Sequence, residues 1–434
     1  MWAVYTSIFK VFTADFLVLL LQSLTSVVVA RYLGPEGVGL YIILLLIPAY
    51  AEAFGRPYFD YSLIYFVGKK KENLSSSLYL VNLMSFIMVI FLSIVFLIYF
   101  KEFKAILFSE TVVGYASLMT CFFFIFPLRL LYLNYSHAFQ AEKKIEKYNN
   151  MHLMQGVLTA ALILISVIFL EGSLLSLILA NIFGILPSII YSMRQVHMSE
   201  HFFVKFDLVL FKKMAKFSLG QYSYNLISYL KLNIGSLFLI AFSGPIQIAF
   251  FNIGKTMADA ITRLVPNAVN IIIYPELSNM LDPQEALELL IQSYRVTLSL
   301  LLLMALPVLL FSEFLILTLY GEAFEGAVLP FNITLVSFVF HRSSLIFASY
   351  FSSFGRTGIL ATMIAPGLAL QTIVFIFYFS DAAAFGASCS FLVGVALTHA
   401  IMVLYFNLFH KCEVKSFIPR ISDFKDIING IKVK

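Results

Sequence analysis

The sequence predicts an all-α polytopic membrane protein with about twelve transmembrane helices, arranged as two pseudo-symmetric six-helix bundles around a central cavity. Of the 434 residues, 61% are hydrophobic and 12% are charged, and the mean hydropathy is +0.92. Apolar runs recur along the whole chain, and each is long enough to cross a hydrocarbon core about 30 Å thick as a helix rising about 1.5 Å per residue. A glycine-rich corner also occurs twice, about 210 residues apart. Such an internal repeat is typical of membrane transporters.

The apolar runs define the predicted spans in order. The first run is too long for a signal peptide and lacks a small-x-small cleavage site, so we expect it to remain as the first span. A helix of 18 or more apolar residues is the criterion for each of the others. The twelve predicted spans are residues 11–33, 38–66, 75–100, 111–140, 149–170, 173–193, 214–241, 246–274, 294–319, 327–353, 357–380 and 383–409.

The corner lies between the first two spans, where residues 30–41 read ARYLGPEGVGLY. Gly34 frees the backbone for a tight turn, and Pro35 fixes one φ angle and ends the preceding helix. About 210 residues further on, Gly244 and Pro245 occupy the equivalent positions. The repeat predicts that the two halves of the chain share one design.

The distribution of cations predicts the orientation in the membrane. With the N-terminus inside, cytoplasmic segments hold 20 of the 29 Lys and Arg residues, and the outer loops hold Arg31, Lys101 and Lys104. Because positive charge favours the cytoplasmic side, we expect both termini to be cytoplasmic. The predicted domains are a six-helix bundle (1–193), a basic cytoplasmic linker (194–213), a second six-helix bundle (214–410) and a basic cytoplasmic tail (411–434).

Composition and spacing also exclude several functions. The net charge is +5, but the cations concentrate in the predicted cytoplasmic segments. This distribution indicates orientation in a membrane and not a nucleic-acid partner. Cys121, Cys389 and Cys412 are far apart, so neither a disulfide framework nor a metal site is predicted. The sequence has neither a glycine-rich phosphate-binding loop nor the motif of a Ser-His-Asp catalytic triad. Its outer loops are too short to form a catalytic domain. We therefore expect a protein that is not an enzyme.

Ten charged residues lie inside the predicted spans, together with His341 and His399. An ionisable group at mid-bilayer costs a few kcal/mol on insertion scales, so these residues must face one another or a hydrated cavity. For any single residue, an intramembrane ion pair or a side chain that reaches the interface explains the charge equally well. The six cations are Arg56, Arg129, Lys231, Lys255, Arg263 and Arg342, and the four acids are Asp15, Glu52, Asp60 and Asp259.

Two stripes of charge favour the cavity. Glu52, Arg56 and Asp60 fall at i, i+4 and i+8 on the second span, and Lys255, Asp259 and Arg263 repeat this spacing on the eighth. Residues with this spacing share one face of a helix. We therefore expect spans 1, 2, 7 and 8 to line a polar cavity.

The corner resembles the A-R-x-L-G-P-x-x-x-G-x-Y signature of the polysaccharide transporter branch of the multidrug/oligosaccharidyl-lipid/polysaccharide exporter superfamily, which includes the O-antigen (Wzx-type) flippases. The resemblance covers nearly the whole chain, because shorter matches follow in the expected order. They are Gly254-Lys255, Tyr274-Pro275-Glu276-Leu277-Ser278, Leu319-Tyr320-Gly321, Gly355-Arg356 and Phe385-Gly386-Ala387. The twelve spans differ from the fourteen expected of peptidoglycan-precursor members of the superfamily.

The resemblance implies a flippase of the bacterial inner membrane that moves an undecaprenyl-diphosphate-linked oligosaccharide to the outer leaflet by alternating access. Membrane lipids and other surface-polysaccharide assembly proteins are the expected partners, and no cofactor is expected beyond a coupling H+ or Na+. The candidate residues are Arg56, Lys255, Arg263, Lys231 and Arg129 for the diphosphate and glycan, Asp15, Glu52 and Asp259 for ion coupling or charge balance, and Arg31, Gly34, Pro35 and Glu36 for an outer gate.

Two other classes stay open at this point. A multidrug or cation antiporter of the same superfamily favours an acidic, aromatic cavity, whereas six cations against four acids lie within the predicted spans here. A membrane glycan polymerase or ligase is expected to carry a large outer loop, and the longest outer segment here is only about residues 101–110. Both observations favour the flippase.

Overall fold

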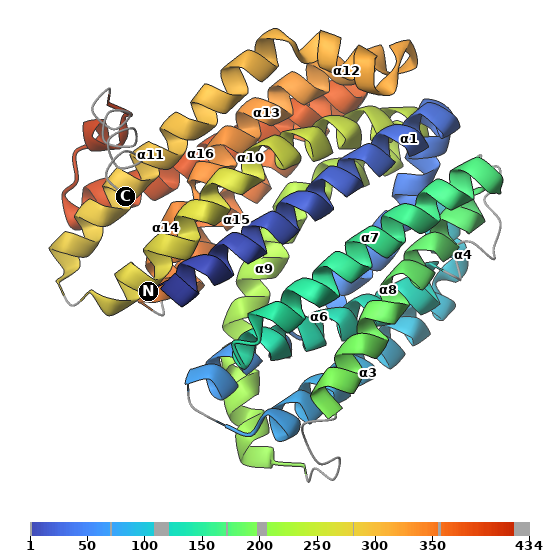
Figure 1. The fold of residues 1–434 in the computed structure, drawn as a ribbon. Coiled ribbons are helices and arrows are strands. Elements are labelled where there is room, and N and C mark those ends of the chain that lie inside the picture. The colour runs from blue at the N-terminus through green and yellow to red at the C-terminus, as the bar shows by residue number, and fades with distance from the viewer. Residues whose placement is uncertain are drawn as a thin grey trace. The chain divides into compact units, whose positions relative to one another are not determined.

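The computed structural model describes residues 2–69, 72–107, 121–170, 172–197, 206–280, 282–354 and 357–420. The described residues form helices joined by short connections, with no strand among them (Figure 1). Within these residues, 9 helices are long and apolar enough to cross a membrane. The prediction of an all-α polytopic membrane protein is confirmed.

These helices cover ten of the twelve predicted spans, because the first two predicted spans form one helix with a kink at the corner. The fourth predicted span is described only from residue 121 onward, since residues 108–120 lie outside the described ranges. The eighth is a continuous helix that carries Lys255, Asp259 and Arg263. It is not among these nine helices, and its charged and polar residues lower its apolar content.

Residues Met1–Leu226 form the first of two compact units, here called unit 1. Within it α7 packs against both α8 and α1, and α6 packs against α3 and α8 (Figure 1). Its elements are α1 (Trp2–Gly55), α2 (Phe59–Leu63), the π-helix η1 (Ile64–Lys69), α3 (Leu74–Ile98), α4 (Phe100–Leu107), the π-helix η2 (Cys121–Ile125), α6 (Phe126–Ala141), α7 (Ile145–Phe169), α8 (Leu174–His197) and the first part of α9 (Leu208–Phe242).

Residues Ile227–Lys434 form unit 2. Here α10 packs against α13, α15 against α16, and α13 against α16. Its elements are the remainder of α9, α10 (Pro245–Asn279), α11 (Pro283–Leu310), α12 (Ser312–Tyr320), η3 (Glu322–Ala327), α13 (Val328–Ser343), α14 (Leu345–Ser353), α15 (Thr357–Val374), the π-helix η4 (Phe375–Phe379), η5 (Ser380–Ala382), α16 (Ala383–His410) and η6 (Val414–Phe417).

The boundary between the two units lies inside α9, after Leu226. The sequence instead predicts a linker at residues 194–213, of which residues 198–205 lie outside the described ranges. Residues 421–434 of the predicted tail and the Gly355-Arg356 motif also lie outside them. The linker and the tail therefore stay predictions.

The repeated corner is confirmed by the backbone of both halves. Gly34 has φ 66° and ψ 177°, and Pro35 follows it. Gly244 has φ 104° and ψ 176°, and Pro245 is the first residue of α10. A positive φ is readily adopted by glycine alone, so the same residue pair builds the same turn twice.

Replacing Gly34 by alanine is expected to destabilise the protein by about 1–2 kcal/mol, because a Cβ is strained at positive φ. Space is not the reason, since an added Cβ would meet no atom within 4 Å. Gly358 in α15 offers a matched control, because it has equal space and no positive φ. There alanine should be neutral or stabilising. Thermal unfolding in detergent measures both, and equal melting temperatures for G34A and G358A would contradict the turn-strain argument.

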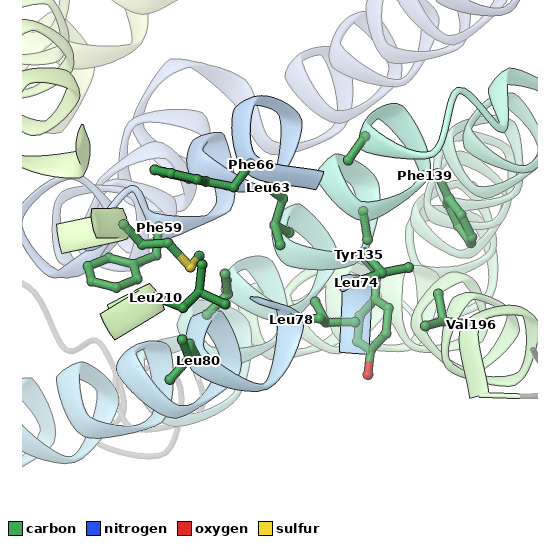
Figure 2. Packing of buried hydrophobic residues seen from close by; sticks show 14 of the residues in the cluster. Phe59, Leu63, Phe66, Leu74, Leu78, Leu80, Tyr135, Phe139, Val196 and Leu210 are labelled. Atoms are coloured by element: carbon green, nitrogen blue, oxygen red, sulfur yellow. The ribbon is translucent and has the colours of Figure 1, made fainter. Parts of the chain in front are cut away.

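A buried apolar cluster of unit 1 holds α2 and η1 in place (Figure 2). Lipid tails are as apolar as leucine, so close packing rather than exclusion of water stabilises such contacts in a membrane. This cluster fixes the short helix that follows the end of α1. Its labelled members are Phe59, Leu63, Phe66, Leu74, Leu78, Leu80, Tyr135, Phe139, Val196 and Leu210.

Candidate functional site

The helix of the second predicted span breaks at Arg56. The Arg56 amide donates to the Glu52 carbonyl over 2.8 Å, which closes α1. Pro57 lacks an amide hydrogen and cannot continue the ladder. Tyr58 then takes a left-handed conformation, with φ 55° and ψ 21°, before α2 begins at Phe59. A broken helix inside a membrane needs other partners for the backbone groups that it frees.

Helix α9 supplies two of these partners within unit 1. The Ser218 hydroxyl donates to the Tyr58 carbonyl over 3.2 Å, and the Tyr222 hydroxyl donates to the Phe54 carbonyl over 3.1 Å. Ser218 is buried. The start of α9 therefore stabilises the break in the helix.

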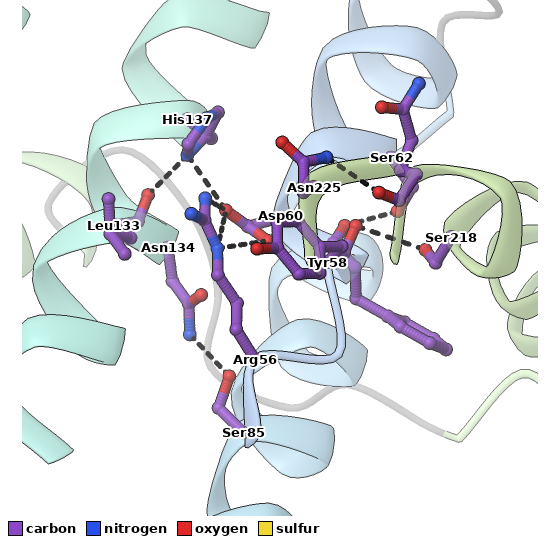
Figure 3. A network of polar contacts seen from close by, with 12 residues as sticks. Arg56, Tyr58, Asp60, Ser62, Ser85, Leu133, Asn134, His137, Ser218 and Asn225 are labelled. Carbon is purple, nitrogen blue, oxygen red and sulfur yellow. Dashed lines mark hydrogen bonds and ion pairs between the residues drawn. The ribbon is translucent and has the colours of Figure 1, made fainter. Parts of the chain in front are cut away.

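The side chains at this break form a closed network (Figure 3). Arg56 is ion-paired with Asp60, and its Nε donates to Asp60 Oδ2 over 3.1 Å. The guanidinium lies 4.8 Å from the Tyr58 ring centre and 5.1 Å from that of Tyr61. His137 Nδ1 lies 3.1 Å from Asp60 Oδ2. Every charge of this network has a partner of opposite sign or a polar neighbour.

Arg56 therefore lies in a protein interior rather than on a polar surface, with 9% of its surface exposed, and Asp60 has 1% exposed. The expected stripe on the second span is also interrupted, because the break at residues 56–58 separates Asp60 from α1. Glu52 contacts a different partner. The contacts of Arg56 thus lie at the break in the helix, and its part in diphosphate binding stays a prediction.

Glu52 accepts a hydrogen bond from Arg129 Nε over 2.6 Å. The Arg129 side chain is 45% exposed and that of Glu52 15%. This pair joins α1 to α6. Arg129 is the more exposed of the two cations of unit 1 predicted to bind the diphosphate.

Asp15 contacts a histidine that the sequence does not single out. His152 Nε2 lies 3.3 Å from Asp15 Oδ1, and His152 Nδ1 lies 3.1 Å from the Tyr132 hydroxyl. The chain of three groups joins α1, α7 and α6. Tyr148, one turn before His152 on α7, stacks on its ring. Tyr148 and His152 are four residues apart and so share one face of an otherwise apolar helix. This pattern is the sequence signal that could have identified His152.

In unit 2 the expected stripe exists on one unbroken helix, α10. Lys255 Nζ donates to Asn233 Oδ1 over 2.6 Å. Asp259 is ion-paired with Arg342 of α13. Arg263 is half-buried, and no hydrogen bond or ion pair reaches it within the described part of the chain. Among the described residues, the stripe thus places on one helix face two cations that have no carboxylate within 4 Å.

Lys231 is the most deeply buried of the cations, with 2% of its surface exposed. Its Nζ donates to Thr398 Oγ1 on α16 over 2.6 Å. The next residue, His399, joins two further helices, because its Nε2 lies 2.7 Å from the Tyr294 hydroxyl and its Nδ1 2.9 Å from Ser344 Oγ. The sequence predicts Lys231 as a site residue but gives no sign of these partners.

The residues predicted to form an outer gate lie around the corner in α1. Arg31 and Glu36 are exposed, one on each side of Gly34 and Pro35. Their part in gating stays a prediction.

A cavity of about 570 Å³ in unit 2 lies apart from all of these residues. Its lining includes Glu313, Glu325 and Asp381, together with Gln247 and Asn332. Carboxylates repel a phosphate group, so this lining does not suit an anionic ligand. The cationic residues of α10 are the better candidate for an anion.

The intramembrane charges named above differ in balance between the units. Unit 1 holds three acids against two strong bases, and every one of them contacts a charged or titratable partner. Unit 2 holds a single one of these acids, Asp259, against Lys231, Lys255, Arg263 and Arg342. Unit 2 therefore has the excess of positive charge.

Charged residues within membrane-spanning helices, as the described part of this chain has them, are typical of polytopic membrane proteins that move ions or substrates. The chain belongs to the polysaccharide biosynthesis protein family, whose model matches residues 28–329. The predicted resemblance to polysaccharide transporters is confirmed by this match.

Similar proteins agree with this class. A Shigella flexneri protein named "Putative O-antigen transporter" is 24% identical over 392 residues, which are 85% of this chain and 89% of that protein. The lipid II flippase MurJ in an inward closed conformation has a TM-score of 0.75 at 13% identity, over 94% of this chain and 89% of MurJ. A multidrug resistance MATE family transporter in an inward-facing conformation has a TM-score of 0.68 at 12% identity, over 91% of this chain and 94% of the transporter. At these identities the two structures show a common fold.

Proposed function

We propose that this protein is a flippase that carries an undecaprenyl-diphosphate-linked oligosaccharide, such as an O-antigen unit, from the cytoplasmic to the outer leaflet of a bacterial inner membrane by alternating access. Both termini lie in the cytoplasm in this proposal, as the distribution of cations favours. The family match and the similarity to an O-antigen transporter support it. The substrate then presents a diphosphate and a polar glycan, while its hydrocarbon tail stays in the lipid.

The observation that carries the proposal is the positive face of α10. Lys255 is held by a neutral amide, and Arg263, two turns further along, has no partner in the described part of the chain. A guanidinium can bind phosphate oxygens through two parallel hydrogen bonds. We propose Arg263 and Lys255 as the diphosphate contacts of unit 2, and Arg129 as the exposed cation of unit 1.

The acids predicted to couple ions take different parts in this proposal. Glu52 and Asp259 balance Arg129 and Arg342, because each is ion-paired with that cation. Asp15 has His152 as its partner, and both side chains are partly exposed. We keep Asp15 as the candidate site for a coupling H+ or Na+.

Reconstitution in liposomes tests the function. Vesicles carry a fluorescent undecaprenyl-diphosphate oligosaccharide in both leaflets, and a reductant that does not cross the membrane bleaches the outer leaflet only. We expect the protein to expose the inner pool within minutes, whereas protein-free vesicles retain it. A fluorescent phosphatidylethanolamine in the same vesicles should stay protected, because it lacks a diphosphate.

Two results would contradict the proposal. One is protection of the inner pool at every protein density. The other is equal movement of both lipids, which would indicate a leak or a nonspecific scramblase. Export of a cationic dye without movement of the oligosaccharide would instead support an antiporter.

A further inference from the structure

Lys231 is a buried amine with too few acceptors for its charge. Its Nζ donates to Thr398 Oγ1 over 2.6 Å, and the Thr398 hydroxyl donates in turn to the Gly394 carbonyl over 2.9 Å. The lone pairs of the hydroxyl oxygen therefore face the lysine. An ammonium group has three N–H donors. Within the described residues, Thr398 supplies the one acceptor, and no carboxylate lies within 4 Å.

Such a site is costly for a charged amine. Moving an ammonium group out of water costs several kcal/mol unless a counter-charge or a full set of hydrogen bonds compensates. Arg56 has this compensation from Asp60. Lys231 has 2% of its surface exposed, and the described residues offer it a single hydroxyl. The neutral amine satisfies the same contact without the desolvation cost.

The groups around Lys231 make a positive charge still less favourable. His399 on α16 and His341 on α13 lie within electrostatic reach of it. Arg342 follows His341 on α13, and its charge is paired with Asp259 of α10. Two further groups bond to the neighbours of Lys231: Lys255 on α10 contacts Asn233, and Tyr294 on α11 contacts His399. Of these groups only Asp259 is acidic.

We propose that Lys231 is a proton-binding site that sets the affinity of unit 2 for its anionic cargo. The amine is neutral while the site is empty. When a diphosphate binds to α10, the lysine nitrogen takes a proton from water, which forms its third N–H bond and adds one positive charge to unit 2. This inference rests on the proposed function, because it needs a diphosphate ligand.

The linkage has a definite sign. A proton on Lys231 strengthens the attraction of the site for an anion, and by reciprocity a bound anion strengthens proton binding by the same factor. Raising the pH removes the proton and must therefore weaken anion binding. For a single proton, the affinity falls by up to about tenfold per pH unit.

Calorimetry on the full-length protein in detergent tests this linkage with a short-chain prenyl diphosphate as the probe. Binding is measured between about pH 6 and about pH 9, in two buffers of different ionisation enthalpy, which gives the number of protons taken up. We expect affinity to fall as the pH rises, with uptake of up to one proton per bound ligand. The ligand has its own phosphate titration, which is common to all variants and is subtracted by comparing them.

Two variants assign the proton. Lys231→Arg keeps a permanent charge, so it should retain tight binding at high pH and lose the proton uptake. Lys231→Gln should bind weakly at every pH, with the same loss of uptake. Because a buried arginine can strain its site, Thr398→Val serves as a further variant that removes the acceptor and leaves the lysine in place. It should change the pH at which affinity falls.

The outcomes separate the two proposals. Wild-type binding that shows no more proton uptake than Lys231→Gln would overturn the role of Lys231 while leaving the flippase intact. The same uptake in wild type and Lys231→Gln, combined with its loss in Asp15→Asn, would assign the proton to Asp15 instead. Failure of the wild type to bind the prenyl diphosphate at any pH would contradict the proposed function itself.

Discussion

Replacing Arg263 by glutamine is expected to lower the rate of lipid-linked oligosaccharide flipping by about 10- to 100-fold, because a hydrogen-bonded charge pair with a phosphate contributes about 1.5–3 kcal/mol. Arg263 has no partner to lose within the described part of the chain. The substitution therefore leaves no buried group unpaired, and the protein should fold and melt as the wild type does. The measurement is the initial rate of exposure of the inner-leaflet substrate in the liposome assay.

Two further variants make this result specific. Arg263→Lys keeps the charge but loses the paired geometry of the guanidinium, so an intermediate rate is expected. Lys212→Gln removes an exposed cation from the start of α9, and its rate should equal that of the wild type. If Arg263→Gln flips the substrate at the wild-type rate, the positive face of α10 does not bind the diphosphate.

The two charge stripes look alike in the sequence, and the structure separates them. Both have the spacing i, i+4 and i+8, which predicts one face of a helix. On α10 the prediction is correct, because no proline interrupts residues 255–263. On the second span Pro57 follows Arg56 and ends α1, so Asp60 starts a new helix and turns back to pair with Arg56. The proline was visible in the sequence, but hydropathy alone gave no reason to place a break there.

The spans and the corners were predictable because each depends on local chemistry. Apolar length defines a membrane helix, and a glycine before a proline allows the turn that both corners share. Partner choice depends on which helices pack together, which no local pattern encodes. Thr398 is thus found beside Lys231 only once α9 and α16 are in place, and His152 beside Asp15 only once α7 lies against α1.

Replacing Asp60 by asparagine is expected to destabilise the protein by about 3–5 kcal/mol, because it leaves the Arg56 guanidinium buried without a counter-charge. Arg56→Gln should cost less, since His137 lies 3.1 Å from Asp60 and can take a proton to pair with it. The double replacement Arg56→Met with Asp60→Leu should recover much of the loss, because apolar residues of similar volume often replace a buried ion pair without cost. Unfolding in detergent and denaturant measures all three.

The half-exposed pair of Arg129 and Glu52 provides the comparison, because a pair that water reaches contributes only about 0–1 kcal/mol. Arg129→Gln should therefore melt close to the wild type. These stability measurements also decide the role of Arg56, which the sequence alone assigns to the diphosphate. A supporting role predicts that the Arg56→Met, Asp60→Leu double variant still flips the substrate once it folds. Loss of flipping in a stable double variant would return Arg56 to the substrate site, because stability would then no longer explain the defect.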